Sequence, residues 1–436
     1  MPVHVPGSLA ELLSLFGPAF TQPTFQTFCG LVIGRIARVG PRTVTGMLIG
    51  ARLSGVWHHS RAHRFFSAAR WSVDELGLRL GDMIVDRLLG TDAAITVAID
   101  DTLLKRCGRR VFGCGLHFDP TSPDPGGGVA WGNNWVVAGL LLRLPFLARP
   151  ICLPILFRLV LPKGQGPNRL GLARELVELI LARYPDRDVH VVADGAYAGK
   201  TWVGIEGRVT LTFRLRHNAA LHTPPPPPTG KRGRPRTTGD RLATPAQIAN
   251  DPATNWQHTK ATCYGKTETL KLNVLDCLWY GVFATTPIRV VIVQRPNEHH
   301  FALISTNTTA SAATLVERYA ARWAIETAFE DAKSLAGVGD ARNRTPRAVQ
   351  RTAPFGFLTL TLTAVWYALS GHHPDVVADH RARAPWYRTK TNPSHADMLA
   401  QLRRTIIAAQ YPPQQPPTPT PAEITQVQHA WAAAGL

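Results

Sequence analysis

The middle of the chain contains short, continuous apolar runs that stop at aspartates. One run, Ile95–Ile99, ends at Asp100 and Asp101, and a second predicted strand, over 188–193, ends at Asp194. Runs of this length that are rich in β-branched residues are typical of buried central strands. The periodicity between and after them predicts strands over 134–143, 150–160 and 207–213 and a helix near 167–184. Strands followed by alternating helices and strands predict an α/β fold with a mixed sheet.

After Asp194 the strand pattern is interrupted by five consecutive prolines, Pro224–Pro228. A polyproline stretch cannot lie inside a sheet, so it marks an insertion. Strand patterns resume over 256–306, which predicts that the insertion is mainly β. The expected division is a helical domain over 1–90, the α/β domain over 91–216 and 307–372, the β insertion over 217–306, and a helical extension with a proline-rich linker over 373–436.

Residues 1–90 predict short helices separated by glycine and proline, with many arginines and few acids. In SRAHRFFSAARW, Ser60 can cap a helix that directs Arg61 and Arg64 outward and two phenylalanines inward. The segment Ser72–Glu75 has the pattern of a capping box for the next helix. This favours a DNA-binding helical domain. A basic helical domain that reads no sequence is the alternative.

Near the other end, Phe355–Leu369 is an apolar stretch interrupted by three threonines. Its length is typical of a buried core helix and is too short to span a bilayer. Ser394 is placed to cap a following helix that carries Arg403 and Arg404, and Pro412–Pro421 reads as a linker. The start of the chain lacks the basic segment of a secretory signal. We therefore expect no membrane partner.

The stretch YAARWAIETAFEDAK, from Tyr319 to Lys333, carries polar side chains at helical spacing. Tyr319, Arg322, Glu326 and Lys333 are separated by 3, 4 and 7 residues, so a helix places them in one narrow stripe. Glu330 falls on the same stripe. The apolar residues lie elsewhere on the helix, which indicates that the stripe faces a polar environment. The alternative is a solvated helix in which Arg322 and Glu326 form an i,i+4 salt bridge.

The composition indicates a polyanionic partner. The 436 residues include 48 Lys and Arg against 30 Asp and Glu, which gives a net charge of +18. Nucleic acid is the polyanion that such a chain fits best. The six cysteines form no C-x-x-C pair, so a zinc ribbon is not supported.

Three carboxylates on the predicted elements, Asp100, Asp194 and Glu326, could bind a metal ion together. A carboxylate surrounded by a tyrosine, an arginine and a lysine, as Glu326 is, suits a site where a metal ion meets phosphates. Asp100 and Asp194 stand at the ends of predicted strands, where open α/β sheets bind their ligands. One such aspartate alone is more often a turn residue or a helix N-cap. Two of them together with the polar helix favour a catalytic metal site.

The motifs resemble those of the DDE transposases of bacterial insertion sequences. The helix matches Y-x-x-R-x-x-x-E followed by six residues and K, the segment Asp100–Thr102 matches D-x-T, and Asp194–Tyr197 matches D-x-x-Y. The resemblance implies an RNase H-like catalytic domain with a β insertion, in a bacterial cytoplasmic enzyme. It also implies a homodimer on the inverted repeats of double-stranded DNA. Two Mg²⁺ ions, for which Mn²⁺ can substitute, would be held by Asp100, Asp194 and Glu326.

DNA contacts are expected from several other residues. Tyr319, Arg322 and Lys333 would hold phosphates near the scissile bond. A basic cluster that resembles a minor-groove arginine hook comprises Lys231, Arg232, Arg234 and Arg236. A solvated linker is the alternative for this cluster. Trp279, beside Tyr280 on a predicted strand, is a candidate to stack on a flipped base.

The role of Asp101 stays open, because only one of two neighbours on a strand can face the site. Three functions also stay open. They are a transposase, an RNase H-like nuclease that cuts without joining, and a basic DNA-binding protein whose carboxylates are structural.

Overall fold

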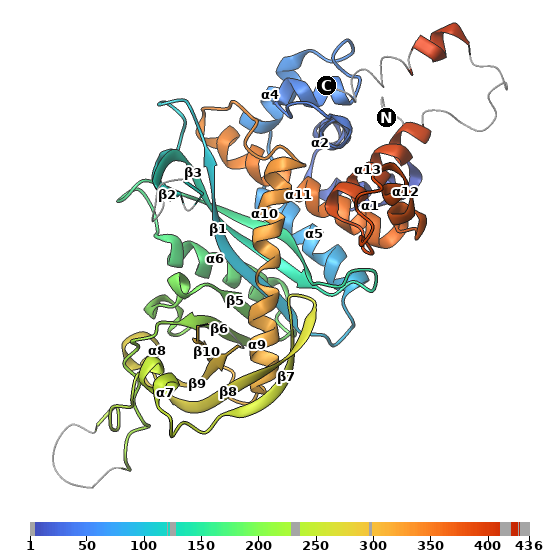
Figure 1. The fold of residues 1–436 in the computed structure, drawn as a ribbon. Helices are drawn as coiled ribbons and strands as arrows, with labels where there is room; N and C mark the ends of the chain where they lie inside the picture. The colour runs from blue at the N-terminus through green and yellow to red at the C-terminus, as the bar shows by residue number, and fades with distance from the viewer. Residues whose placement is uncertain are drawn as a thin grey trace.

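A mixed β-sheet runs from the middle of the molecule to its lower end in Figure 1, and most of the helices gather around its upper part. The structure is a computed structural model that describes residues 5–119, 121–122, 128–227, 236–295, 299–409, 420–425 and 427. The strands are β1 Ile95–Lys105, β2 Gly115–Asp119, β3 Gly128–Leu142, β4 Ile151–Val160, β5 Val189–Ala193, β6 Val209–Leu215, β7 Gln257–Cys263, β8 Lys266–Leu278, β9 Pro287–Gln294 and β10 Phe301–Ser305.

Strand pairing confirms the predicted mixed α/β class. β1 pairs antiparallel with β3 and parallel with β5, and β5 pairs parallel with β6. β3 also pairs antiparallel with β4. The resulting order β4-β3-β1-β5-β6 agrees with the RNase H-like fold that the resemblance implies. β1 does not end at Asp100 as expected but continues to Lys105, because β3 offers a partner for every residue up to Gly132.

The strands expected for the β insertion extend this same sheet. β10 pairs antiparallel with β6, and β9, β8 and β7 follow in order beyond it. The open edge of β6 therefore receives four further strands (Figure 1). The division of the chain into domains stays a prediction.

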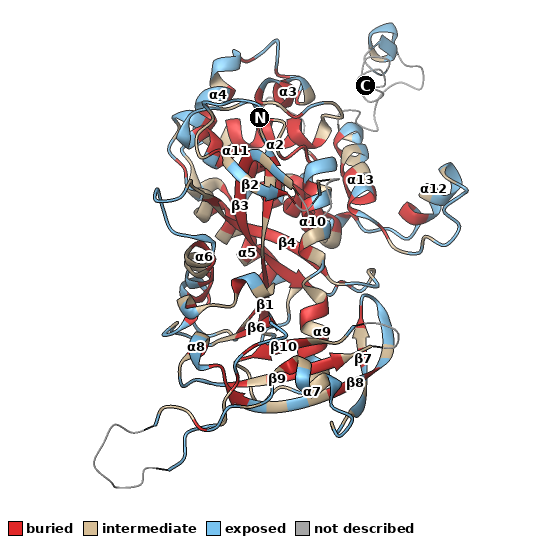
Figure 2. Ribbon diagram, turned by 60° about the vertical axis from the view of Figure 1, so that its left-hand side comes forward, coloured by how far each residue is buried: buried red, intermediate tan, exposed pale blue. Residues whose placement is uncertain are grey.

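Helices cover both faces of the sheet. β3 is buried at every position from Gly132 to Leu142, which requires cover on each side. α5, α6, α10 and α11 pack on β4 (Figure 2). α5 comes close to β4 at Gly77, where a Cβ atom would lie 1.9 Å from the Ile155 carbonyl oxygen. The helical elements are α1 Gly7–Ser14, η1 Gly17–Ala19, α2 Gln22–Ala37, α3 Val44–Gly50, α4 His59–Ser67, α5 Val73–Leu88, α6 Arg169–Arg183, η2 Gly195–Tyr197, η3 Lys200–Trp202, α7 Pro245–Asn250, α8 Tyr280–Phe283, α9 Ala312–Ala321, α10 Ala324–Ser334, α11 Pro346–Trp366, η4 Tyr367–Gly371, α12 Asp375–Arg383 and α13 His395–Ala408.

The apolar stretch near residue 360 is a core helix, as expected. Pro346–Gly371, comprising α11 and the π-helical turn η4, is long and apolar enough to cross a membrane by length and composition, but 89% of its most apolar window is buried inside the fold. The N-terminal helices pack directly on it, because Phe66 and Phe28 lie 5.3 and 6.0 Å from the ring of Phe355. The N-terminal helices thus share a hydrophobic core with the sheet.

α4 differs from its prediction at one of its two arginines. The helix begins at His59 and is capped by His58, two residues before the expected Ser60. Arg64 is exposed, but Arg61 is partly buried and donates from Nε to Thr27 Oγ1 at 2.9 Å. Its guanidinium also lies 3.9 Å from the centre of the Trp57 ring. These contacts turn Arg61 inward, so the expected outward placement is wrong for this residue.

The N-terminal cap of α5 has one of the two contacts of the expected capping box. Ser72 caps α5 by accepting a hydrogen bond from the Glu75 amide at 3.3 Å. The carboxylate of Glu75 instead forms an ion pair with Arg79, with Nε and Oε1 2.6 Å apart.

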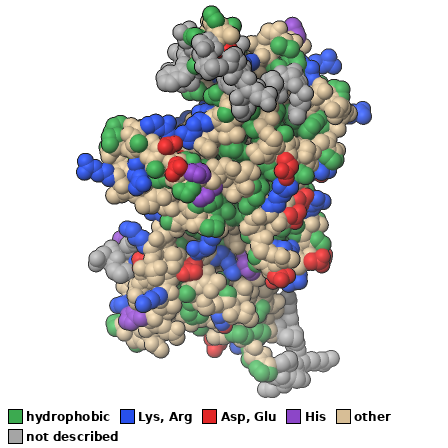
Figure 3. Space-filling view, turned by 90° about the vertical axis from the view of Figure 1, so that its right-hand side faces the viewer, with side chains coloured by type: hydrophobic (Ala, Val, Ile, Leu, Met, Phe, Trp, Pro, Cys, Tyr) green, Lys and Arg blue, Asp and Glu red, His purple; other side chains and the backbone are tan. Residues whose placement is uncertain are grey.

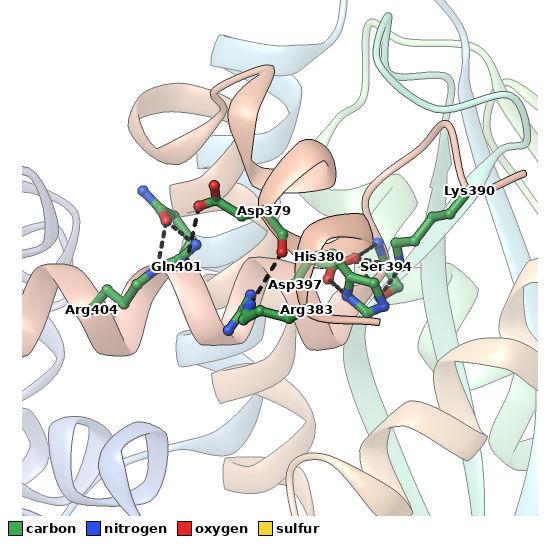
Figure 4. A network of polar contacts seen from close by, with 8 residues as sticks. All are labelled: Asp379, His380, Arg383, Lys390, Ser394, Asp397, Gln401 and Arg404. Carbon is green, nitrogen blue, oxygen red and sulfur yellow. Dashed lines mark hydrogen bonds and ion pairs between the residues drawn. The ribbon is translucent and has the colours of Figure 1, made fainter. Parts of the chain in front are cut away.

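The C-terminal extension is fixed by a buried carboxylate (Figure 4). Ser394 caps α13 as expected, and Asp397 completes a capping box with it. Asp397 also lies 2.7 Å from Lys390 Nζ and 2.7 Å from His380 Nδ1. Burial raises the pKa of Asp397, but the hydrogen bonds from Lys390 and Ser394 outweigh burial and hold it below its ordinary value. Most of the Pro412–Pro421 linker lies outside the described residues.

This network makes the stability of the fold dependent on acid. A carboxyl with a depressed pKa stabilises the fold above its unfolded pKa, near 4, and that contribution is lost as the pH falls through its folded pKa. We expect Asp397→Asn to lower the free energy of unfolding by about 1–3 kcal/mol at pH 7. The difference from wild type should shrink below about pH 4. Urea unfolding across this range measures it. Asp379→Asn is the matched control, because Asp379 is exposed and lies 3.6 Å from Arg404; an equal loss in both variants would contradict the assignment.

Candidate active site

The two predicted strand-end aspartates lie side by side. Ile99 of β1 pairs in parallel with Ala193 of β5, so the residues that follow, Asp100 and Asp194, leave the same edge of the sheet on adjacent strands. Neighbouring strands are about 4.8 Å apart. β5 ends here, whereas β1 continues along β3. Asp100 therefore marks the end of the parallel pairing and not the end of its strand.

The helix that carries Glu326 is tightened at its middle. The expected single helix over 319–333 is divided into α9 and α10, which meet at Arg322 and Trp323. The amides of both residues donate to carbonyls three positions earlier, at 3.0 and 3.3 Å. Such 3₁₀-type turns inside a helix often mark functional positions. The tightening brings the Arg322 guanidinium to 5.6 Å from the centre of the Tyr319 ring.

Arg322 joins the three predicted catalytic carboxylates. It donates from Nη1 to Asp100 Oδ2 at 2.8 Å and from Nη2 to Glu326 Oε1 at 2.9 Å. Asp194 also acts on Arg322 electrostatically. The i,i+4 salt bridge of the solvated-helix alternative is thus present, but the Arg322 side chain is only 11% exposed and bridges to a residue 222 positions away. At Tyr319, Arg322 and Glu326 the polar stripe therefore faces the sheet edge and not bulk solvent.

Around Arg322 the negative charges outnumber the positive ones. Burial raises the pKa of Asp100 to about 6, although Arg322 acts to lower it, and Asp101 and Glu326 raise it further. Burial also raises the pKa of the Tyr319 phenol. Three carboxylates therefore share one arginine. A cation placed among them would relieve the repulsion that Asp100 experiences.

Asp101 points away from Asp100 and has its own partners. Its carboxylate accepts hydrogen bonds from Asn134 Nδ2 at 2.8 Å, from Tyr197 Oη at 2.9 Å and from Arg169 Nη1 at 3.0 Å. The tyrosine of the D-x-x-Y motif thus fixes the residue next to Asp100. The sequence did not identify Asn134 and Arg169 as partners of Asp101. Its one signal was Tyr197, whose D-x-x-Y motif had already been set beside the D-x-T motif that contains Asp101.

Lys333 and Glu330 lie farther along α10. Both side chains are exposed. The Lys333 ammonium interacts electrostatically with Asp119 and Lys105, which themselves form an ion pair with Nζ and Oδ2 2.7 Å apart. Lys333 therefore reaches toward the far end of β1 and toward the end of β2, beyond Asp100.

Of the basic cluster predicted to contact DNA, the structure describes only one residue. Lys231, Arg232 and Arg234 lie outside the described residues, whereas Arg236 is exposed and lies 3.6 Å from Asp240. Basic side chains spread over both halves of the face shown in Figure 3, with smaller groups of acids between them.

The placement of Trp279 corrects its predicted stacking role. β8 ends at Leu278, so Trp279 precedes α8 instead of lying on a strand. Its side chain is buried and packs 6.3 Å from the Phe283 ring, while Tyr280 is 40% exposed. A base cannot reach the buried indole in this arrangement.

The donor set suits a hard divalent cation. Asp100, Asp194 and Glu326 offer only carboxylate oxygens, which Mg²⁺ and Mn²⁺ prefer. Within the part of the chain that the structure describes, no group of three His, Cys, Asp or Glu is yet close enough to hold one ion. The Arg322 guanidinium bridges Asp100 and Glu326 instead. The residues fit the metal provided that Arg322 gives up one carboxylate to it.

Comparison with known proteins assigns the chain to a family. The family described as DDE superfamily endonuclease matches residues 15–272, which include both aspartates and end before Glu326. Among solved structures, a cryo-EM structure of a piggyBac transposase synaptic complex with hairpin DNA is similar at a TM-score of 0.44 and 12% identity, over 94% of this chain and 76% of that one. No curated protein matches. Because the family match covers more than half of the sequence, the chain belongs to the DDE superfamily endonucleases.

Proposed function

We propose that this endonuclease is a transposase that binds the terminal inverted repeats of a mobile element, cuts at its ends and joins them to target DNA. The observation that supports this most is the meeting of Asp100, Asp194 and Glu326 around Arg322. Two Mg²⁺ ions, or Mn²⁺, would activate the attacking water or 3′ hydroxyl and stabilise the leaving 3′ oxygen. The three carboxylates would hold them.

The other residues of the helix position the DNA. Arg322 would hold an oxygen of the scissile phosphate with the guanidinium arm that now binds a carboxylate, since it can pair with either anion. Tyr319, against the same guanidinium, orients it. Lys333 would neutralise the next phosphate toward β2. Asp101 is a positioning residue, because its three partners fix the strand segment that presents Asp100.

The partner would be double-stranded DNA, and the enzyme would act as a homodimer that holds both element ends in the bacterial cytoplasm. A supercoiled plasmid with candidate ends, incubated with the protein and Mg²⁺ or Mn²⁺, tests the proposal. Integration products are expected. Cuts without joining would indicate a nuclease, and DNA binding with neither product would indicate a non-catalytic DNA-binding protein.

A further inference from the structure

A basic hollow lies on the other side of Asp194 from α10. Its volume is about 350 Å³. Gly195, the segment after β6 and the start of β10 meet there, and its polar lining includes Arg214, Arg216, His217, Asn218 and His300. Among the residues that the structure describes, those that line the hollow include no acid. Three basic side chains, those of Arg214, Arg216 and His217, are exposed, so the hollow is open to a large ligand.

The hollow belongs to the same sheet edge as the catalytic carboxylates. β6 runs parallel to β5, and β10 runs antiparallel to β6, so the end of β6 and the start of β10 lie beside Asp194. Each strand adds about 4.8 Å, which places the hollow roughly one to two strand widths from Asp194. Gly195 allows this approach, because a Cβ atom there would lie 2.9 Å from the Arg214 carbonyl oxygen.

Two exposed arginines, Arg214 and Arg216, lie at the end of β6. Arg214 lies in β6 and Arg216 directly follows its last residue; both are exposed, whereas Leu215 between them is buried. The Arg214 guanidinium lies 5.7 Å from the centre of the Phe301 ring. Arg214 also acts electrostatically on Tyr319, which links the hollow to the phosphate-binding side chains of the proposed site.

We propose that this hollow binds the phosphate backbone of the DNA segment on the far side of the scissile phosphate, which is flanking DNA during cleavage and target DNA during joining. The inference rests on the proposed function and adds a second DNA track to it. In an in-line displacement the attacking and leaving oxygens lie on opposite sides of the phosphorus. Lys333 lies toward β2 on one side of the carboxylates, and the hollow lies toward β10 on the other. The element end occupies the Lys333 side, and the second segment occupies the hollow.

The test compares Arg214→Gln/Arg216→Gln with Arg381→Gln/Arg388→Gln, which removes two exposed charges from the C-terminal extension. The probes are a pre-cleaved candidate end, the same end with flanking duplex, and a duplex without any end sequence. The hollow variant should bind the pre-cleaved end within about twofold of wild type, since that end does not reach the hollow. Its salt-dependence slope on the other two duplexes should fall by about 2, one unit for each arginine. Joining of the pre-cleaved end to target should fall about tenfold or more.

Two results would overturn the inference. An equal loss on all three duplexes would place the element end itself in the hollow, and unchanged slopes with unchanged joining would show that the hollow contacts no DNA. Failure of the proposed function is distinct, because the wild-type protein itself would then join no end to target, whether or not it cut. In that case the slope on the duplex without end sequence still decides whether the hollow binds DNA. Circular dichroism spectra equal to wild type exclude misfolding.

Discussion

Replacement of Asp100, Asp194 or Glu326 by its amide is expected to abolish DNA cleavage while end binding stays nearly intact. Each change removes an anionic oxygen from the proposed metal site but leaves the arginines and lysines that would contact DNA in place. Metal ions supply several kcal/mol of stabilisation to the transition state, so the rate should fall at least about 10³-fold. Cleavage of a labelled end duplex and its gel-shift affinity are the two measurements.

Glu330→Gln is the matched control. Glu330 lies one turn farther along α10 and is exposed, with no ion pair to Arg322 in the described structure. It should cleave at nearly the wild-type rate. A loss confined to Glu330→Gln would move the third ligand one turn along the helix, and retained cleavage in Glu326→Gln would remove Glu326 from the metal site.

The Asp100 variant also has a stability signature that separates a lost ligand from a damaged fold. Because the folded pKa of Asp100, about 6, lies above the ordinary value, the wild-type fold gains this carboxyl's contribution below about pH 4 and loses it as the pH rises through 6. In EDTA at pH 7, Asp100→Asn should therefore have a higher free energy of unfolding than wild type, by up to about 2–3 kcal/mol, and should unfold at a higher denaturant concentration. Added Mg²⁺ should stabilise wild type and not the variant. A less stable variant at pH 7 would show that the Arg322 ion pair outweighs burial.

Much of this site could be predicted from the sequence, because local patterns define it. The β-branched runs define the strands that carry Asp100 and Asp194, and helical spacing defines the stripe from Tyr319 to Lys333. These signals need no knowledge of distant partners. The edge of β6 that receives β10 could not be predicted, because strand pairing across 86 residues, from 215 to 301, leaves no periodic trace.

The directions of several side chains could not be predicted from the sequence either. Arg61 turns inward to Trp57 and Thr27, although helical spacing placed it outward, because a buried ring and hydroxyl offer better contacts than solvent. Trp279 is buried because β8 ends one residue before it. Asp101 is held by Asn134 and Arg169, which lie 33 and 68 positions away. Each outcome depends on tertiary neighbours and not on the local pattern.

Removal of the Arg322 side chain is expected to have opposite effects on metal binding and on cleavage. In the described structure its guanidinium bridges Asp100 and Glu326, so it competes with any ion for the same oxygens. Arg322→Ala should therefore bind Mg²⁺ more tightly than wild type when no DNA is present, by about tenfold or more, because the carboxylates then lack their cation. In EDTA the variant should also be less stable by about 3 kcal/mol, since Asp100 loses the partner of a largely buried pair.

Cleavage by Arg322→Ala should nevertheless fall by about 10²–10³-fold, because the same guanidinium would stabilise charge that develops on the scissile phosphate. Isothermal titration with Mg²⁺ and single-turnover cleavage at saturating Mg²⁺ separate the two effects. Arg169→Ala serves as the control, since Arg169 pairs with Asp101 and not with the carboxylates of the proposed metal site; its Mg²⁺ affinity should stay near that of wild type. If Arg322→Ala bound Mg²⁺ no more tightly than wild type, the guanidinium would not occupy the metal position. If it lost stability but cleaved at the wild-type rate, Arg322 would be only a structural ion pair of this helix.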